Sequence, residues 1–208
     1  MPFHDREIVA IVVGASFAAG LNVYATLLTL GLLAHAHAIQ LPPALHLLES
    51  WTVIGIAGAL FCLEFIADKV PAFDLIWNAL HTFVRVPMAA LLAYGATQQL
   101  SLGGQIAAAV LGGLIAFASH GGKTAVRAAV TPSPEPFSNI VLSFGEDVVA
   151  VSLTWFATQH PWIAAAVVGV LLVITIFAVR WVVRALKRMF RKIHSWTKAK
   201  AAENRRLF

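Results

Sequence analysis

The stretch LSFGEDVVAVSLTW, residues 142–155, places two adjacent acids, Glu146 and Asp147, inside an otherwise apolar run. A carboxylate is costly in hydrocarbon, so an acid within a membrane segment normally faces protein or water and pairs with a cation. The groups that accompany these two acids therefore decide how the surrounding helices are arranged.

The composition indicates a membrane protein with several spans. Hydrophobic residues make up 59% of the 208 residues and charged residues only 12%, and the mean hydropathy is +0.79. A soluble domain usually carries about twice that share of charge. Several apolar runs approach the ~20 residues needed to cross a bilayer. These runs cover residues 8–36, 51–67, 75–97, 102–119, 138–158 and 162–183.

The runs predict an all-α polytopic bundle of about six transmembrane helices, forming a single domain over residues 1–183. The first run is too long for one untilted span, and Gly20 is a candidate break within it. The N-terminal MPFHDREIV has mixed charges and is not typical of a signal peptide, so we expect it to be retained.

The basic residues predict the orientation. Lys and Arg occur at 6, 69, 85, 123, 127 and from 180 to 206, whereas the breaks at 37–50, 98–101 and 159–161 contain none. Cytoplasmic loops carry the excess of Lys and Arg. With six spans, both termini and the connectors near 69 and 123–127 are predicted to be cytoplasmic.

The C-terminal segment 184–208 is predicted to be a basic amphipathic helix. Its basic residues interleave with apolar ones, which favours a helix lying on an anionic inner leaflet. A basic run beside a span is explained without nucleic acid, and we expect no nucleic-acid partner. The residues expected to contact anionic lipid are Arg184, Lys187, Arg188, Arg191 and Lys192.

An internal repeat is visible when residues 78–98 are aligned with 139–159. Seven of the 21 positions are identical, and Asn78 aligns with Asn139. A weaker third copy begins at Asn22. The alignment predicts two or three tandem hairpins, at about 22–67, 78–119 and 139–183, with a pseudo-symmetry axis along the membrane normal. Each Asn is either a helix N-cap or a recurring polar site.

The alignment suggests a partner for the opening acids. Arg85 aligns with Glu146, and each lies seven residues, roughly 10 Å, beyond its Asn. We therefore predict that Arg85 meets Glu146 or Asp147 near the bundle axis, because such pairing makes buried charges tolerable. The second acid then either meets Lys123 or Arg127 or stays protonated.

The two connectors on the basic side hold complementary charges. Glu64 and Asp68 are spaced i, i+4 and repel unless a cation or proton lies between them, and Lys123 and Arg127 have the same spacing with positive charge. One interpretation is a salt-bridge network that closes this end of the bundle. The other is a site for a charged solute or a lipid headgroup.

Other chemistry is less well supported. The eight histidines lack ligand spacing with any acid, so no metal site or cofactor is expected. No nucleophile-elbow, zinc-protease or phosphate-loop pattern occurs, and an enzyme is the less favoured class.

The runs GLNVYATLL, EFIADKVPAFD, GGKTAVRAAVTPSPEPFSN and GEDVVA together resemble a family of small bacterial membrane proteins, designated domain of unknown function four-one-two-six. The resemblance covers most of residues 10–180 and omits the basic tail. It implies a bacterial inner-membrane location and supplies no activity.

We favour a transporter or channel for a small charged solute. The alternatives are a protein that binds or translocates anionic lipid and a non-catalytic assembly partner. Small residues at 14, 15, 18, 19, 112 and 113 permit close helix packing or association with a second copy. The candidate site residues are Arg85, Glu146, Asp147, Glu64, Asp68, Lys69, Asp74, His120, Lys123, Arg127, Asn22, Asn78 and Asn139.

Overall fold

The computed structural model describes residues 5–69, 71–130 and 136–204, and all the regular elements within these ranges are helices. The side chains of 5–6, 71–75, 128–130, 136–139, 190 and 192–204 are outside the description. The elements are α1 (Asp5–Leu21), α2 (Val23–His35), the short 3-10 helix η1 (Pro43–Glu49), α3 (Trp51–Ala67), α4 (Pro71–Ala96), α5 (Leu102–Val130), α6 (Pro136–Gln159) and α7 (Pro161–Asn204).

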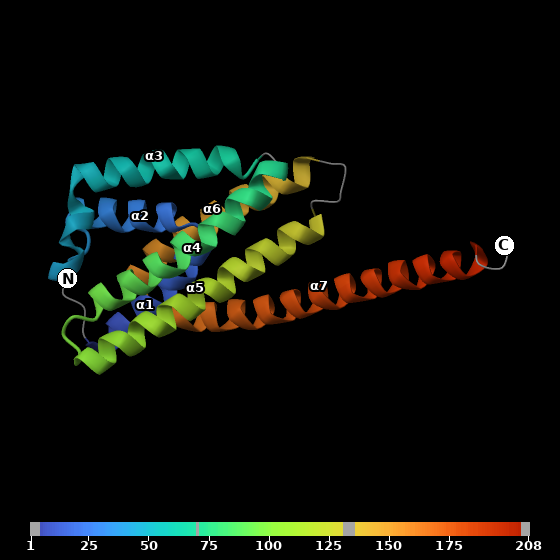
Figure 1. The fold of residues 1–208 in the computed structure, drawn as a ribbon. Helices are drawn as coiled ribbons and strands as arrows, with labels where there is room; N and C mark the ends of the chain where they lie inside the picture. Colours follow the sequence, from blue (N-terminus) through green and yellow to red (C-terminus); the bar gives the residue numbers. More distant parts are fainter. Residues whose placement is uncertain (1–4, 70, 131–135, 205–208) are drawn as a thin grey trace.

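The bundle has two distinct ends. We call one end the loop end, because it holds the junctions α2–α3, α4–α5 and α6–α7, at residues 36–50, 97–101 and 160. We call the other end the connector end, because it holds the α3–α4 and α5–α6 junctions. The distal part of α7 extends beyond this end (Figure 1). The residues that the sequence identified as basic connectors thus share one end of the bundle.

The first apolar run forms two short helices that reverse direction. Asn22 adopts an extended backbone conformation between them and caps α2, accepting a hydrogen bond from the Ala25 N–H through its side chain. The start of α1 lies at the loop end, where Ile8 and Val12 pack against Ala93 near the end of α4. Because α2 also ends at the loop end, α1 and α2 form a hairpin that enters from this end and turns inside the bundle (Figure 1).

The hairpin changes the number of spans. Within the described residues, four helical segments, in α4, α5, α6 and α7, are long and apolar enough to cross a membrane. A fifth span results if η1 and α3, which meet at an angle of 67°, are counted together. Glu7–Leu21 and Val23–His35 are shorter. The prediction of about six spans treated residues 8–36 as one crossing, whereas a polar cap at Asn22 divides that run into two half-length helices.

The hairpin also changes the predicted placement of the ends. Both termini were predicted to share one side, but α1 begins at the loop end and α7 extends past the connector end. The physical reason is the reversal at Asn22, since the first run returns to the end from which it started.

The interior is unusual because it buries charge and exposes apolar side chains. Arg85, Arg127 and Glu64 are the three largest fully buried side chains. Large apolar residues such as Phe83, Phe117 and Val170 are more than half exposed. This inversion of the soluble pattern is expected where hydrocarbon surrounds the helices.

Small residues allow the helices to approach closely, as predicted. An added Cβ at Gly14 would lie 2.6 Å from Ala157 Cβ, and one at Gly112 would lie 2.7 Å from Ala93 Cβ. Gly20 was a candidate break, but the break falls at Asn22, and Gly20 instead allows α1 to contact α5. There a Cβ would lie 2.4 Å from the carbonyl oxygen of Ala116.

The tail is helical, as predicted, but it continues α7 without interruption. Span and tail form one helix of 44 residues, Pro161–Asn204, which projects beyond the other helices in Figure 1. A separate amphipathic helix lying flat on a membrane surface would require a bend that α7 does not show.

We expect Gly20→Ala to destabilise the protein by about 1–3 kcal/mol, because the added methyl group forces α1 and α5 apart. The matched control is Gly55→Ala, since a Cβ at Gly55 meets no atom within 4 Å. Thermal unfolding in detergent, followed by size-exclusion chromatography, measures both variants. Equal stability of the two would contradict the close α1–α5 contact.

Candidate functional site: a buried ionic network

Lys123 on α5 lies at the centre of a network of buried charges. Its Nζ is 2.8 Å from Asp68 Oδ2, 3.2 Å from Glu146 Oε2 and 3.8 Å from Glu64 Oε1. Glu64 and Asp68, one turn apart near the end of α3, therefore have the intervening cation that their spacing required. The lysine side chain is fully buried, so these interactions form in a low dielectric, where they are strong.

Arg127, one turn beyond Lys123 on α5, also connects the end of α3 to α6. Its guanidinium donates to both carboxylate oxygens of Glu146 and to Asp68 Oδ2, the latter at 3.2 Å. A two-pronged arginine–carboxylate contact is strong and fixes orientation. Burial alone would raise the pKa of Asp68, which follows the last residue of α3, but Lys123 and Arg127 outweigh burial and hold this pKa below its usual value.

Arg85 on α4 forms the second half of the network. Its guanidinium pairs with Glu64 and donates to Asn78 Oδ1 at 3.1 Å. The same group lies 2.7 Å from His120 Nδ1, which must accept because a guanidinium only donates. His120 Nε2 then carries the proton, facing Thr82 Oγ1 at 2.8 Å, so His120 is a neutral imidazole in this arrangement.

The turn of the α1–α2 hairpin meets the network directly. Lys123 Nζ donates to the carbonyl oxygen of Leu21 at 3.2 Å, and Ser119 Oγ donates to that of Phe17 at 3.0 Å. Asn22 Nδ2 donates to Asp147 Oδ1 at 2.8 Å. Irregular backbone inside a membrane protein requires such partners, because hydrocarbon offers none.

The structure corrects the predicted partner of Arg85. Among the described residues, Arg85 forms an ion pair with Glu64, and none joins it to Glu146 or Asp147. The alternative, in which one acid meets Lys123 or Arg127, is confirmed for Glu146. The alignment fixed the depth of each charge along its helix, but it carried no information about which neighbour each helix faces.

The predicted match between the two connectors is confirmed by the ion pairs of Lys123 and Arg127 with Asp68. Asn22 is the N-cap that its spacing suggested, whereas Asn78 lies within α4 and accepts from Arg85. Lys69 donates to the Phe65 carbonyl and lies over the Phe65 ring. It forms no ion pair with the described residues of the network, but it lies near enough for the charges of Asp147 and Asp68 to act on it. The side chains of Asp74, Asn139 and Lys192 fall outside the described part of the chain.

Sequence reasoning missed Ser143, which is fully buried one turn before Asp147 on α6. The alignment of 78–98 with 139–159 contained a signal, because it pairs Ser143 with Thr82, which contacts His120. Two oxygens on this face of α6, Ser143 Oγ and Asp147 Oδ2, are buried without a hydrogen-bond partner in the described structure. Such groups usually mark water, an ion or a functional constraint.

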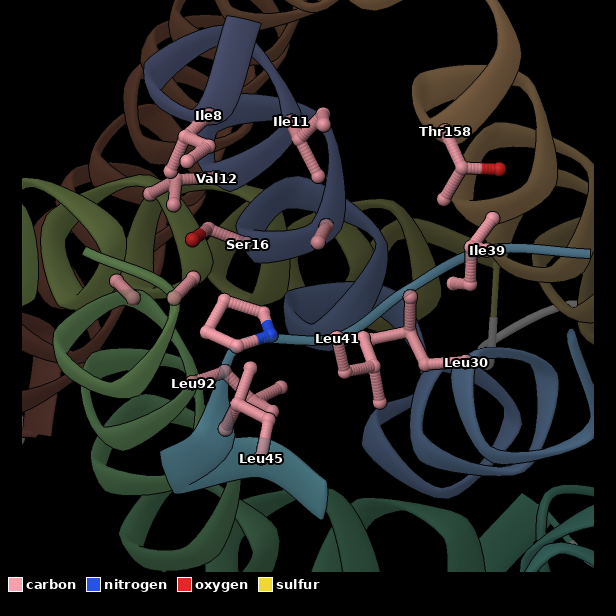
Figure 2. A pocket seen from close by; sticks show the side chains of 14 residues that line it. Ile8, Ile11, Val12, Ser16, Leu30, Ile39, Leu41, Leu45, Leu92 and Thr158 are labelled. Carbon is pink, nitrogen blue, oxygen red and sulfur yellow. The ribbon is translucent and has the colours of Figure 1, made fainter. Parts of the chain in front are cut away.

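A cavity of about 40 Å³ lies between the arms of the hairpin at the loop end. Figure 2 shows α1 on one side of it, the chain around Ile39 and Leu41 on another, and Thr158 of α6 at its edge. Its lining is apolar apart from Ser16 and Thr158. At this volume the cavity is too small for a hydrated solute.

No group of three or more His, Cys, Asp or Glu residues within the described ranges is arranged to hold a metal ion. The site is instead a set of pairwise ion pairs and hydrogen bonds contributed by α3, α4, α5, α6 and the turn of the hairpin.

An all-helical bundle with membrane-length apolar helices and a buried ionic network defines a polytopic membrane protein. The family model described as "Domain of unknown function (DUF4126)" matches residues 9–181, and the chain belongs to this family. No curated protein and no solved structure matches the chain.

The Glu64–Arg85 pair yields a test by double-mutant cycle. We expect Arg85→Ala and Glu64→Ala each to destabilise the protein by roughly 3–5 kcal/mol, because each leaves a buried charge unpaired. The double variant should lose much less than the sum. Chemical or thermal unfolding in detergent provides the free energies.

The matched control is the cycle between Arg85 and Glu146, which should show the weaker coupling. A stronger coupling to Glu146 than to Glu64 would support the pairing suggested by the repeat and contradict the structure.

Proposed function

We propose that the protein is a transporter or channel for a small charged solute. The observation that carries the proposal is the hairpin of α1 and α2, which stops inside the bundle with its turn against Lys123 and Asp147. Broken helices in transporters place helix ends and irregular backbone at the substrate site. The same arrangement here joins the turn of the hairpin to the buried charges.

The cost of the buried charges also supports a transport role. Taking charges out of water is expensive, and replacing buried ion pairs with apolar residues often increases stability. A bundle that only had to remain assembled would not need three cations and four acids in its interior. Intramembrane charges commonly mark solute or ion pathways.

The proposed pathway connects the two ends through the hairpin. The small cavity lies at the loop end, and Ser16 on its wall is six residues, about 9 Å along α1, from Asn22. From Asn22 the path continues through the network, which closes the connector end. Opening requires the hairpin arms to separate at one end or the ion pairs to part at the other.

We assign the network one joint role. The site residues predicted from the sequence include Arg85, Glu146, Asp147, Glu64, Asp68, Lys69, Lys123 and Arg127. Because the ion pairs join most of these residues directly, we propose a single site in which the solute replaces one of the existing partners. Lys69 is then a neighbour of the site.

We also propose a bacterial inner-membrane location with the connector end in the cytoplasm. The support is the concentration of basic residues at that end. In this orientation the C-terminal helix is cytoplasmic, and α1 starts on the opposite side.

Cysteine accessibility tests the orientation in a Cys62→Ser background. A cysteine at Gln40, exposed at the loop end, should react with a membrane-impermeant maleimide in intact cells. A cysteine at Arg191, exposed on α7, should react only after the cells are opened. The reverse pattern would overturn the proposed orientation.

Flux into proteoliposomes tests the function with a panel of inorganic ions and small organic anions. We expect flux above empty vesicles for at least one solute, and a loss of at least about tenfold in Lys123→Gln, because a tenfold change requires only ~1.4 kcal/mol. Arg180→Gln, an exposed cation on α7, is the matched control and should keep full flux. Absence of flux for the whole panel would refute transport of these solute classes.

A specific observation favours lipid binding as the second candidate. Trp181, Arg184 and Arg188 line a shallow groove on α7, where a ring and two guanidinium groups suit an anionic headgroup. Native mass spectrometry should then show anionic lipid that is lost in Arg184→Gln/Arg188→Gln. A partner protein without flux or lipid would favour the assembly role.

A further inference from the structure

The described network leaves one of its acids without an ion pair. Its acids are Glu64, Asp68, Glu146 and Asp147, and the cations that form ion pairs with them are Lys123, Arg85 and Arg127. His120 adds no charge, because its Nδ1 accepts from Arg85. A buried carboxylate without an ion pair is costly, and a single bound cation neutralises it.

Asp147 is the acid that lacks an ion pair. Lys123 and Arg127 form ion pairs with Asp68 and Glu146, and Arg85 pairs with Glu64, but no ion pair to Asp147 occurs among the described residues. Its side chain is 4% exposed, and its single hydrogen bond in the described structure is from Asn22 to Oδ1. The other oxygen, Oδ2, is buried and has no partner.

The surroundings of Asp147 are otherwise defined. Glu64 and Asp68 at the end of α3 and Lys123 on α5 lie near enough for their charges to act on Asp147. Lys69, the residue after Asp68, acts on it as well. Glu146 precedes Asp147 on α6 and pairs with Arg127. In sequence, α7 has no ionisable residue before Arg180. The ionisable groups of α1 are at the loop end, within residues 5–7, and those of α2 are Tyr24 and His35.

Asn22 connects this carboxyl to the turn of the hairpin. One end of its amide donates to Asp147 Oδ1 at 2.8 Å, and the other end accepts from the Ala25 N–H at 2.9 Å as the cap of α2. A neutral carboxylic acid accepts this hydrogen bond more weakly than a carboxylate does. The protonation state of Asp147 therefore affects the strength of the hydrogen bond that attaches the turn of the hairpin to α6.

We propose that Asp147 binds a proton from bulk water at Oδ2, and that Asn22 couples this proton to movement of the α1–α2 hairpin. Protonation neutralises the carboxylate that has no ion pair and loosens the Asn22 contact, and loss of the proton restores both. The inference deepens the proposed transport function by naming a proton as the coupling ion, and it rests on that function only for its physiological use.

Infrared difference spectroscopy of the full chain in lipid nanodiscs tests the proton site. Spectra recorded at low and high pH should show the carbonyl band of a protonated carboxyl group. The band should persist in Glu146→Gln and be lost in Asp147→Asn. If Asp147→Asn does not fold, Asp147→Glu should shift the band, and a band unchanged in these Asp147 variants would overturn the proposal.

Sodium ions are the competing occupant. The same titration is repeated with sodium chloride replaced by choline chloride. A proton site gives the same band in both salts. The competing result is that, at the pH of half-protonation, added sodium abolishes the band and slows hairpin movement. The site is then a sodium site, and the proton assignment is wrong.

Spin labels test the coupling to the hairpin. In a Cys62→Ser background, labels at Val9 on α1 and Leu32 on α2, which are 44% and 43% exposed, report the separation of the two arms. The distance distribution should change with pH and stay in its low-pH form in Asp147→Asn. Asn22→Ala should keep the infrared band and lose the distance response, and an unaltered response would overturn the coupling.

The two hypotheses fail separately. A titrating Asp147 without solute flux would leave the proton site standing and remove the transport function. Flux without an Asp147 band would leave transport standing and remove the proton site.

Discussion

The structure depends on one buried cation, the Nζ of Lys123. It contacts acids from two helices and the last carbonyl of α1, so one side chain holds α3, α6 and the turn of the hairpin together. A lysine without these partners would be strongly unfavourable in hydrocarbon. The acids in turn tolerate burial because Lys123 and Arg127 lie among them. The helices that contribute to the network are thus held in place by charges on their neighbours.

This mutual dependence explains why the interior is polar and the surface apolar. Apolar side chains gain little from packing against each other when lipid surrounds the bundle, so close contacts between small residues and satisfied polar groups hold the helices together. The glycines at 14, 20 and 112 provide the first contribution, and the network provides the second. Where α1 and α5 cross, a small-residue contact and a polar contact occur together, since Ser119 donates to the Phe17 carbonyl beside Gly20.

Part of this arrangement was predictable from sequence. The i, i+4 spacing of Glu64 with Asp68 and of Lys123 with Arg127 predicted facing acidic and basic surfaces, because helical geometry alone puts each pair on one face. The partner of Arg85 was not predictable, since an alignment of repeats reports depth but not the direction in which a side chain points. The hairpin was also hidden, because an apolar run of about 29 residues looks alike whether it crosses once or turns back. Only Asn22, the polar cap within that run, distinguished the two, and Ser143 was overlooked because it lacks charge.

The uninterrupted α7 has a mechanical consequence. A helix of 44 residues is about 66 Å long, roughly twice the hydrocarbon thickness of a bilayer. If the first half of α7 crosses a bilayer along its normal, the last third lies beyond the bilayer. Fifteen residues beyond Met189 the axis has advanced roughly 22 Å, well past the ~8 Å over which salt screens a charged surface. In that arrangement an anionic leaflet attracts the basic residues nearest the span, and the end of the helix reaches into the surrounding water.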